Sequence, residues 1–139
     1  MINWLNQQDE FWEGTFRSEF FRNEDNQNEL FICAECPVDT DYIEKAVQAF
    51  NALSKETIRE ICKGIIRLAE QGGENEDFTL PELETPEQIL DYCWFTTLYI
   101  NTQDGGIILE GEGEWEEVIG IVIKNDKIIY IGTEYFDYD

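Results

Sequence analysis

The spacing of hydrophobic residues places predicted strands at both ends of the chain and predicted helices in the middle. Apolar and β-branched runs at residues 11–21 and 30–35 predict two strands joined by a polar turn. Four further runs predict a meander of strands, at residues 94–101, 106–112, 118–123 and 127–131. The last two are separated by Lys-Asn-Asp-Lys at residues 124–127, which predicts a tight hairpin.

Helical periodicity lies between the two groups of strands. Apolar residues recur three and four positions apart over residues 41–53 and again over residues 54–69. Thr40 or Asp41 is the predicted cap of the first helix, and Ser54 is the predicted cap of the second. A glycine pair follows the second helix and is predicted to end it.

A third, short helix is predicted from Thr85, with Pro86 in its first turn, to about residue 92. Strands and helices segregated in this way indicate an α+β fold. We expect an antiparallel sheet of about five or six strands, formed by an N-terminal hairpin plus a C-terminal meander, with two or three helices packed on one face. Residues 1–139 are predicted to form a single domain.

Alternation along the predicted strands assigns side chains to two faces of the sheet. One isoleucine set is expected beneath the helices: Ile119, Ile121, Ile123, Ile129 and Ile131. The opposite face carries a ladder of glutamates and an apolar patch: Glu110, Glu112 and Glu114 beside Ile108, Val122, Ile128 and Tyr130. An apolar patch rimmed by carboxylates is typical of a protein-binding surface. The same pattern also fits an outer face that glutamates simply keep hydrated.

The charge of the chain narrows the classes of partner. Thirty-one acidic residues against nine basic ones give a net charge of −22, and fourteen acids but no base lie between Arg67 and Lys124. Nucleic acid is excluded as a partner because its binding depends on clustered Lys and Arg, and anionic membranes are disfavoured for the same reason. The charge favours a monomer, and it favours a basic protein or a cation as the partner.

Catalytic and metal-binding chemistry finds little support. The chain has no histidine, which removes the commonest general base and the usual zinc ligands. Cys33 and Cys36 have CxxC spacing but lie at the end of a predicted strand, and in an extended strand these two positions point to opposite faces. We therefore interpret them as structural. The acidic turn at residues 23–29 lacks the glycine and final glutamate of an EF-hand. We expect no enzyme, catalytic residue, metal site or cofactor.

Targeting signals are not recognisable in the sequence. The N-terminal residues have neither the basic nor the apolar region of a signal peptide, and no apolar run approaches the roughly 18 residues of a membrane span. We therefore expect a cytoplasmic protein.

Two stretches carry a family resemblance. Residues 115–132 combine a tryptophan, an acidic pair, a strand, an Asn-Asp turn and a strand ending in Ile-Gly, and residues 11–15 read Phe-Trp-Glu-Gly-Thr. The chain resembles an uncharacterised family of small bacterial domains related to candidate immunity proteins of bacterial toxin systems. Val118-Ile119-Gly120 stands where that family has a His-Gly-like step. The resemblance implies a protein that binds and blocks a toxin domain.

These observations converge on a non-enzymatic, acidic protein-binding domain. We predict that an acidic sheet face and the C-terminal tail engage the basic partner, through Glu110, Glu112, Glu114, Tyr130, Tyr135 and Asp137. Three alternatives remain. They are an acidic DNA mimic that regulates a DNA-binding protein, a hydrolase that uses two carboxylates beside a tryptophan platform, and a domain without a partner whose acidity serves solubility alone.

Overall fold

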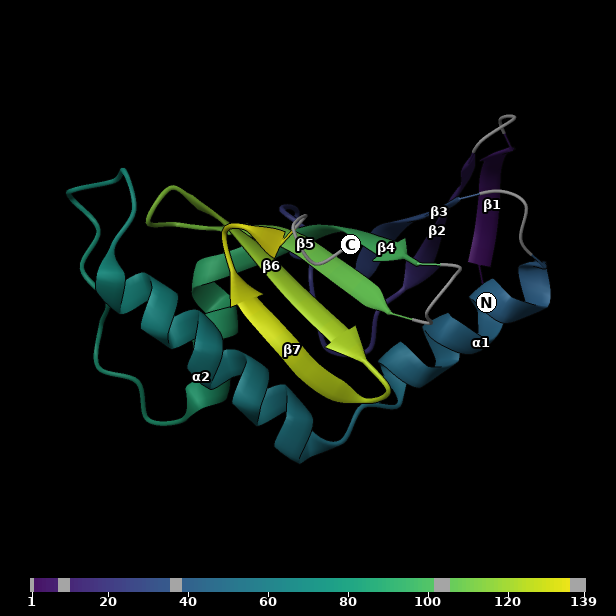
Figure 1. Ribbon diagram of the computed structural model, residues 1–139. Coiled ribbons are helices and arrows are strands. Elements are labelled where there is room, and N and C mark those ends of the chain that lie inside the picture. The colour runs from purple at the N-terminus through teal and green to yellow at the C-terminus, as the bar shows by residue number, and fades with distance from the viewer. Residues whose placement is uncertain (1, 8–10, 36–38, 102–105, 136–139) are drawn as a thin grey trace.

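A computed structural model describes residues 2–7, 11–35, 39–101 and 106–135 of the chain (Figure 1). It is built on one seven-stranded sheet in which the strands lie in chain order. The strands are β1 (Ile2–Gln7), β2 (Phe11–Arg17), β3 (Glu29–Glu35), β4 (Cys93–Ile100), β5 (Ile107–Gly113), β6 (Glu117–Lys124) and β7 (Lys127–Gly132). The helices are α1 (Thr40–Asn51), α2 (Lys55–Gln71) and the 3₁₀ helix η1 (Pro86–Tyr92). The fold is therefore α+β, as predicted.

The sheet differs from the prediction in two respects. It has seven strands rather than five or six, and it is mixed, because β3 and β4 pair in parallel with Phe31 opposite Thr97. All other neighbouring strands are antiparallel. The chain leaves the sheet after β3, forms all three helices and only then returns as β4. A crossover of that length lets β4 run in the same direction as β3.

The strand missing from the prediction is β1, at the edge of the sheet. Its pairing with β2 shifts register between Trp4 and Asn6, a bulge that interrupts the alternation of apolar and polar residues. Ile2 is buried, and the ring of Trp4 meets that of Trp12 with centroids 5.2 Å apart. A short strand with broken alternation gives no strand signal in the sequence.

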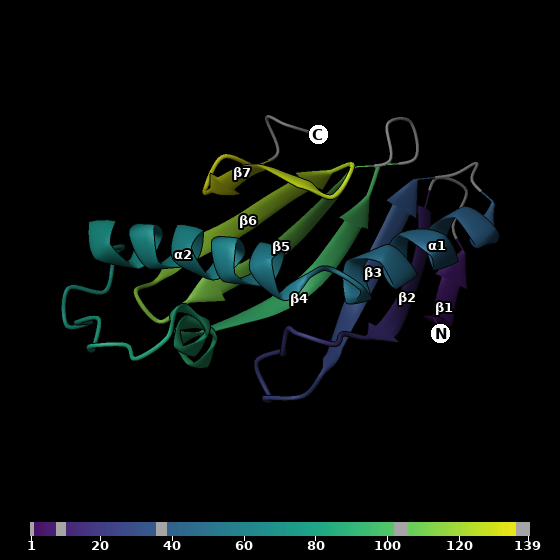
Figure 2. The same ribbon diagram turned by 90° about the horizontal axis from the view of Figure 1, so that it is seen from below.

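The helices α1 and α2 cover one face of the sheet, α1 over its β1 side and α2 over its β7 side (Figure 2). The core between the two layers includes Ile43 and Phe50 of α1 and Ile61 and Ile65 of α2, all at most 1% exposed. Within the core, the ring of Phe21 stacks on that of Phe50. Among the described residues, no helix has the length and apolarity needed to cross a membrane.

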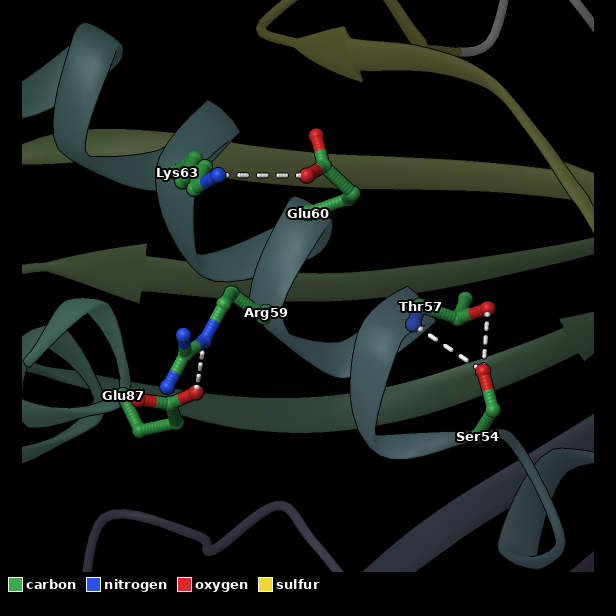
Figure 3. Close-up of polar contacts among 6 residues, drawn as sticks. All are labelled: Ser54, Thr57, Arg59, Glu60, Lys63 and Glu87. Atoms are coloured by element: carbon green, nitrogen blue, oxygen red, sulfur yellow. Dashed lines mark hydrogen bonds and ion pairs between the residues drawn. The ribbon is translucent and has the colours of Figure 1, made fainter.

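The helix ends follow local sequence signals, with one shift. Ser54 caps α2 as predicted, its hydroxyl accepting from the Thr57 N–H at 3.1 Å (Figure 3), and Gly72 ends the helix with φ of 80°. The cap of α1 is Asp39 rather than Thr40 or Asp41, and its carboxylate accepts from the Asp41 N–H at 2.9 Å. Asp39, Thr40 and Asp41 are all residue types that cap helices, so the sequence alone does not select one of them.

The predicted hairpin between β6 and β7 is confirmed, and it is followed by a bulge. Asn125 and Asp126 both have positive φ, as this tight turn requires. Ile123 pairs with Ile128 but Val122 pairs with Tyr130, so Ile129 is an extra residue in β7. Ile128 therefore packs against the core and Ile129 is 47% exposed, the reverse of the predicted assignment.

Candidate protein-binding surface

The face of the sheet opposite α1 and α2, called here the outer face, carries none of the helices that the structure describes (Figure 2). Strand register places Glu110 and Glu112 of β5 on this face, Glu110 beside Thr97 and Gly120, and Glu112 beside Trp94 and Val118. Two of the three glutamates of the predicted ladder therefore lie on β5, and Glu114 lies in the turn that follows the strand. The two strand glutamates lie on an open sheet surface rather than in the core.

The apolar part of the outer face is covered by the segment that follows β7. Ile108, Val122 and Tyr135 form a small buried cluster with Tyr99 and Tyr130 packed against it, called here the outer cluster. The ring of Tyr135 lies against Gly120, which has no side chain to exclude it. The patch predicted as a partner surface thus contacts the protein's own C-terminal segment.

Two hydroxyl contacts hold this segment in place. The Tyr135 hydroxyl donates to Glu110 Oε2 at 2.7 Å, and the Tyr130 hydroxyl accepts from the Glu134 N–H at 3.0 Å. Burial raises the pKa of Tyr135, and its bond to the Glu110 carboxylate raises that pKa further. Burial, and then the charge of Glu110, also raise the pKa of Tyr99. Glu110 is therefore an internal hydrogen-bond acceptor as well as a surface charge.

The predicted binding residues consequently fall into three groups. Glu110, Tyr130 and Tyr135 contribute to the contacts of the outer cluster, and Tyr135 is only 5% exposed. Glu112 and Glu114 are exposed to solvent. Asp137 lies outside the described residues. Among the predicted binding residues that the structure describes, Glu112 and Glu114 are therefore the carboxylates available to a partner.

Glu112 and Glu114 line a broad hollow of about 850 Å³, called here the acidic hollow. Five of its lining residues are acidic, three are aromatic, and none of the described lining residues is basic. The acids are Glu74, Asp77, Glu112, Glu114 and Glu116, and the aromatic residues are Phe78, Tyr92 and Trp94. The hollow thus combines a negative electrostatic field with apolar ring surface.

Backbone contacts bring the acids together from two distant parts of the chain. Asn75, in the loop after α2, donates from its N–H to the Trp115 carbonyl at 3.1 Å and from Nδ2 to the Glu114 carbonyl at 3.0 Å. The Glu74 N–H donates to the Glu116 carbonyl at 3.4 Å. The fully buried Trp115 ring meets Phe78 with centroids 5.6 Å apart. The lining is therefore anchored by the core.

Three of the five acids were not identified as site residues from the sequence. Glu74 and Asp77 belong to an acidic loop, and Glu116 follows Trp115 in the turn between β5 and β6. Nothing local joins that loop to that turn. The available signal was the long run of acids without a base, which identifies the charge of this part of the surface but not its geometry.

The structure also bears on two other kinds of site, a metal site and a reactive cysteine pair. No group of three or more His, Cys, Asp or Glu side chains in the described part of the chain is arranged to hold a metal ion. Burial raises the pKa of Cys33, and the charges of Glu13 and Glu35 raise it further, which disfavours the reactive thiolate. Cys36, the other cysteine of the CxxC pair, lies outside the described residues.

The comparisons with known proteins identify a family without assigning an activity. A family model described as a domain of unknown function (DUF6985) matches residues 2–138, nearly the whole chain. No curated protein and no solved structure matches the chain significantly.

Proposed function

The chain belongs to the DUF6985 family of domains of unknown function, and we propose that this member is a non-enzymatic acidic domain that binds a basic protein partner. The partner class follows from the net charge of −22 and from the acidic hollow. In this proposal the partner is a toxin domain, blocked in the manner of the immunity proteins that the sequence resembles. The protein acts in the bacterial cytoplasm, which suits its free cysteines Cys33, Cys62 and Cys93.

The observation that carries the proposal is the lining of the acidic hollow. Five acidic residues line one open volume without a basic side chain among the described lining residues, whereas surfaces that serve solubility usually mix the two signs. Such a surface repels other anions and accelerates encounter with cations. Phe78, Tyr92 and Trp94 add ring surface of the kind found at the centres of protein interfaces.

The shape of the site supports this proposal more than the DNA-mimic alternative. A mimic presents carboxylates on a convex surface, spaced like phosphates. Here the acids line a concavity, which better fits Lys or Arg side chains that protrude from a partner. For this reason the proposal assigns the surface to direct capture of basic side chains.

The proposal predicts that a basic toxin domain is encoded beside this gene, and that domain is the probe for the test. We expect binding that weakens steeply as salt rises, because exposed charges are screened beyond about 10 Å at 0.1 M ionic strength. Reversing two acids with the double variant Glu112→Lys/Glu114→Lys should weaken binding at low salt by about tenfold, mainly through the association rate.

A matched control changes the net charge equally at another place. The double variant Glu24→Lys/Glu82→Lys alters two exposed residues that do not line the acidic hollow. It should retain most of the affinity, because its charges act only through the overall field. Binding that is indifferent to salt, or equal losses in the two double variants, would contradict the proposal.

One enzymatic alternative uses the same residues. Glycoside hydrolysis requires two carboxylates about 5–10 Å apart, commonly beside aromatic rings, and Glu112, Glu114 and Trp94 all line the acidic hollow. Chromogenic glycosides incubated with the wild type and with Glu112→Gln/Glu114→Gln distinguish the two functions. The binding proposal predicts no turnover in either protein, and turnover abolished by the double variant would replace it.

A further inference from the structure

Phe31 is an exposed aromatic residue in the middle of the sheet. It lies on β3 and is 56% exposed, the highest exposure among the large hydrophobic residues that the structure describes. Its cross-strand neighbours are two short residues, Thr15 on β2 and Thr97 on β4. Because these threonines are short, they leave most of the ring uncovered on the outer face.

The charges around Phe31 make this exposure informative, since a single exposed apolar residue needs no special explanation. The outward positions on β2 and β3 include three exposed glutamates and one exposed arginine: Glu13, Glu29, Glu35 and Arg17. Burial, and then the charges of Glu13 and Glu35, raise the pKa of Cys33, which lies two residues from Phe31 on β3. Both carboxylates are therefore near this part of the strand. The ring is thus set in a mostly negative surface.

This combination selects a cation with a flat face. The face of an aromatic ring attracts cations, and the guanidinium of Arg stacks on rings while donating to carboxylates in a fork. Lys offers a point charge without that planar stacking. An exposed ring among carboxylates therefore suits Arg better than Lys.

A single strand connects this region to the acidic hollow. Trp94, at the start of β4, lines the hollow, and Thr97 of the same strand lies beside Phe31. Three residues of strand span about 10 Å. An extended peptide segment a few residues long therefore reaches both places.

We propose that the surface formed by Glu13, Glu29 and Phe31 docks an arginine-bearing segment of the basic partner, with a guanidinium stacked on the Phe31 ring. The inference rests on the proposed function and extends the binding surface from the acidic hollow across β4 to β3. Glu13 and Glu29 accept the N–H donors of the stacked arginine. Nucleic acid is not the occupant, because the same carboxylates repel phosphate.

The test uses a capped hexa-arginine peptide and a capped hexa-lysine peptide as probes, titrated into the isotope-labelled full chain at low salt. The ring resonances of Phe31 should shift with the arginine peptide. Phe31→Leu keeps apolar bulk but removes the ring, and it should weaken binding of the arginine peptide by about two- to fivefold, the range of an exposed cation–π contact. Its effect on the lysine peptide should be smaller.

Ile129→Ala is the matched control. Ile129 is similarly exposed, at 47%, but lies at the bulge of the edge strand β7, so its loss should leave both affinities unchanged. If the peptides shift Glu112 and Glu114 but not Phe31, or if Phe31→Leu binds as the wild type does, this docking surface is wrong and the proposed function stands. If neither peptide binds at low salt, both fail.

Discussion

The Tyr135 hydroxyl donates to Glu110 Oε2 at 2.7 Å, although 25 residues separate the two along the chain. Glu110 lies on β5, and its partner across the sheet on β6 is Gly120, against which the Tyr135 ring packs. The segment after β7 therefore turns back over β6 to reach β5. This contact gives the sheet a second small buried cluster, on the face that the helices leave uncovered.

Removing the Tyr135 hydroxyl should lower stability in a pH-dependent way. The folded state holds the Tyr135 proton more tightly than the unfolded chain, so this contribution is complete below the ordinary tyrosine pKa of 10.0 and declines as pH rises through the higher folded value. Tyr135→Phe should cost about 1 kcal/mol at neutral pH. Urea unfolding of both proteins should show the difference shrinking towards about pH 11.

The control for that series is Tyr42→Phe. The Tyr42 hydroxyl donates to the Asn101 carbonyl at 3.1 Å, a neutral acceptor, so this variant accounts for the loss of a tyrosine hydroxyl bond as such. A difference between wild type and Tyr135→Phe that stays constant with pH would show that the bond to Glu110 does not control the proton of Tyr135.

Gly120 should tolerate no side chain while Tyr135 is present. A Cβ at position 120 would overlap the Tyr135 ring, so Gly120→Ala should displace the C-terminal segment and cost about 1–3 kcal/mol. In a double-mutant cycle with Tyr135→Ala, most of that cost should vanish, because the ring is gone. If urea unfolding shows that the costs of the two substitutions simply add, the cost of Gly120→Ala does not come from its contact with the Tyr135 ring.

The ion pair between α2 and η1 should contribute little to stability. Arg59 Nε and Glu87 Oε1 are 2.9 Å apart, but the two side chains are 53% and 37% exposed (Figure 3). The hydrogen bond from Arg59 lowers the pKa of Glu87, so the contribution is present above the ordinary glutamate value of 4.5 and lost as pH falls through the lower folded value.

The variant Arg59→Met should therefore cause only a small shift in the urea midpoint, one that high salt abolishes. Lys63→Met, which removes the exposed Lys63–Glu60 pair within α2, is the control for losing one surface cation. A large shift with Arg59→Met that persists in high salt would indicate that this pair is structural, fixing η1 against α2.

Added salt should stabilise this protein. With a net charge of −22, the folded state suffers self-repulsion that counterions screen. The thermal midpoint should rise with sodium chloride, and the double variant Glu112→Gln/Glu114→Gln should have a higher midpoint at low salt and a smaller rise. A midpoint that falls with salt would mean that attractive pairs outweigh repulsion.

Local features of the fold were readable from the sequence because local contacts produce them. The helix α2 is set by its Ser54 cap, by one apolar face and by Gly72 at its end, all within a few turns. The hairpin at Asn125 and Asp126 needs only residues that accept positive φ. The acidity of the region after Arg67 is likewise a property of composition.

Other features depend on contacts between distant residues, which periodicity does not encode. The parallel pairing of β3 with β4 depends on how the intervening helices return the chain, and the bulge at Ile129 inverts the faces predicted by simple alternation. The Tyr135–Glu110 bond joins positions 25 residues apart, and the bond from Asn75 to Glu114 joins positions 39 apart.

By itself, the sequence determined the class of fold, the two ends of α2 and the sign of the charge. Tertiary structure decided which carboxylates are free to meet a partner: it engaged Glu110 with Tyr135 and gathered Glu112 and Glu114 with Glu74 and Asp77 in the acidic hollow. The physical reason is that the exposure and the electrostatic environment of a side chain depend on its neighbours in space. Packing brings those neighbours together from distant parts of the chain.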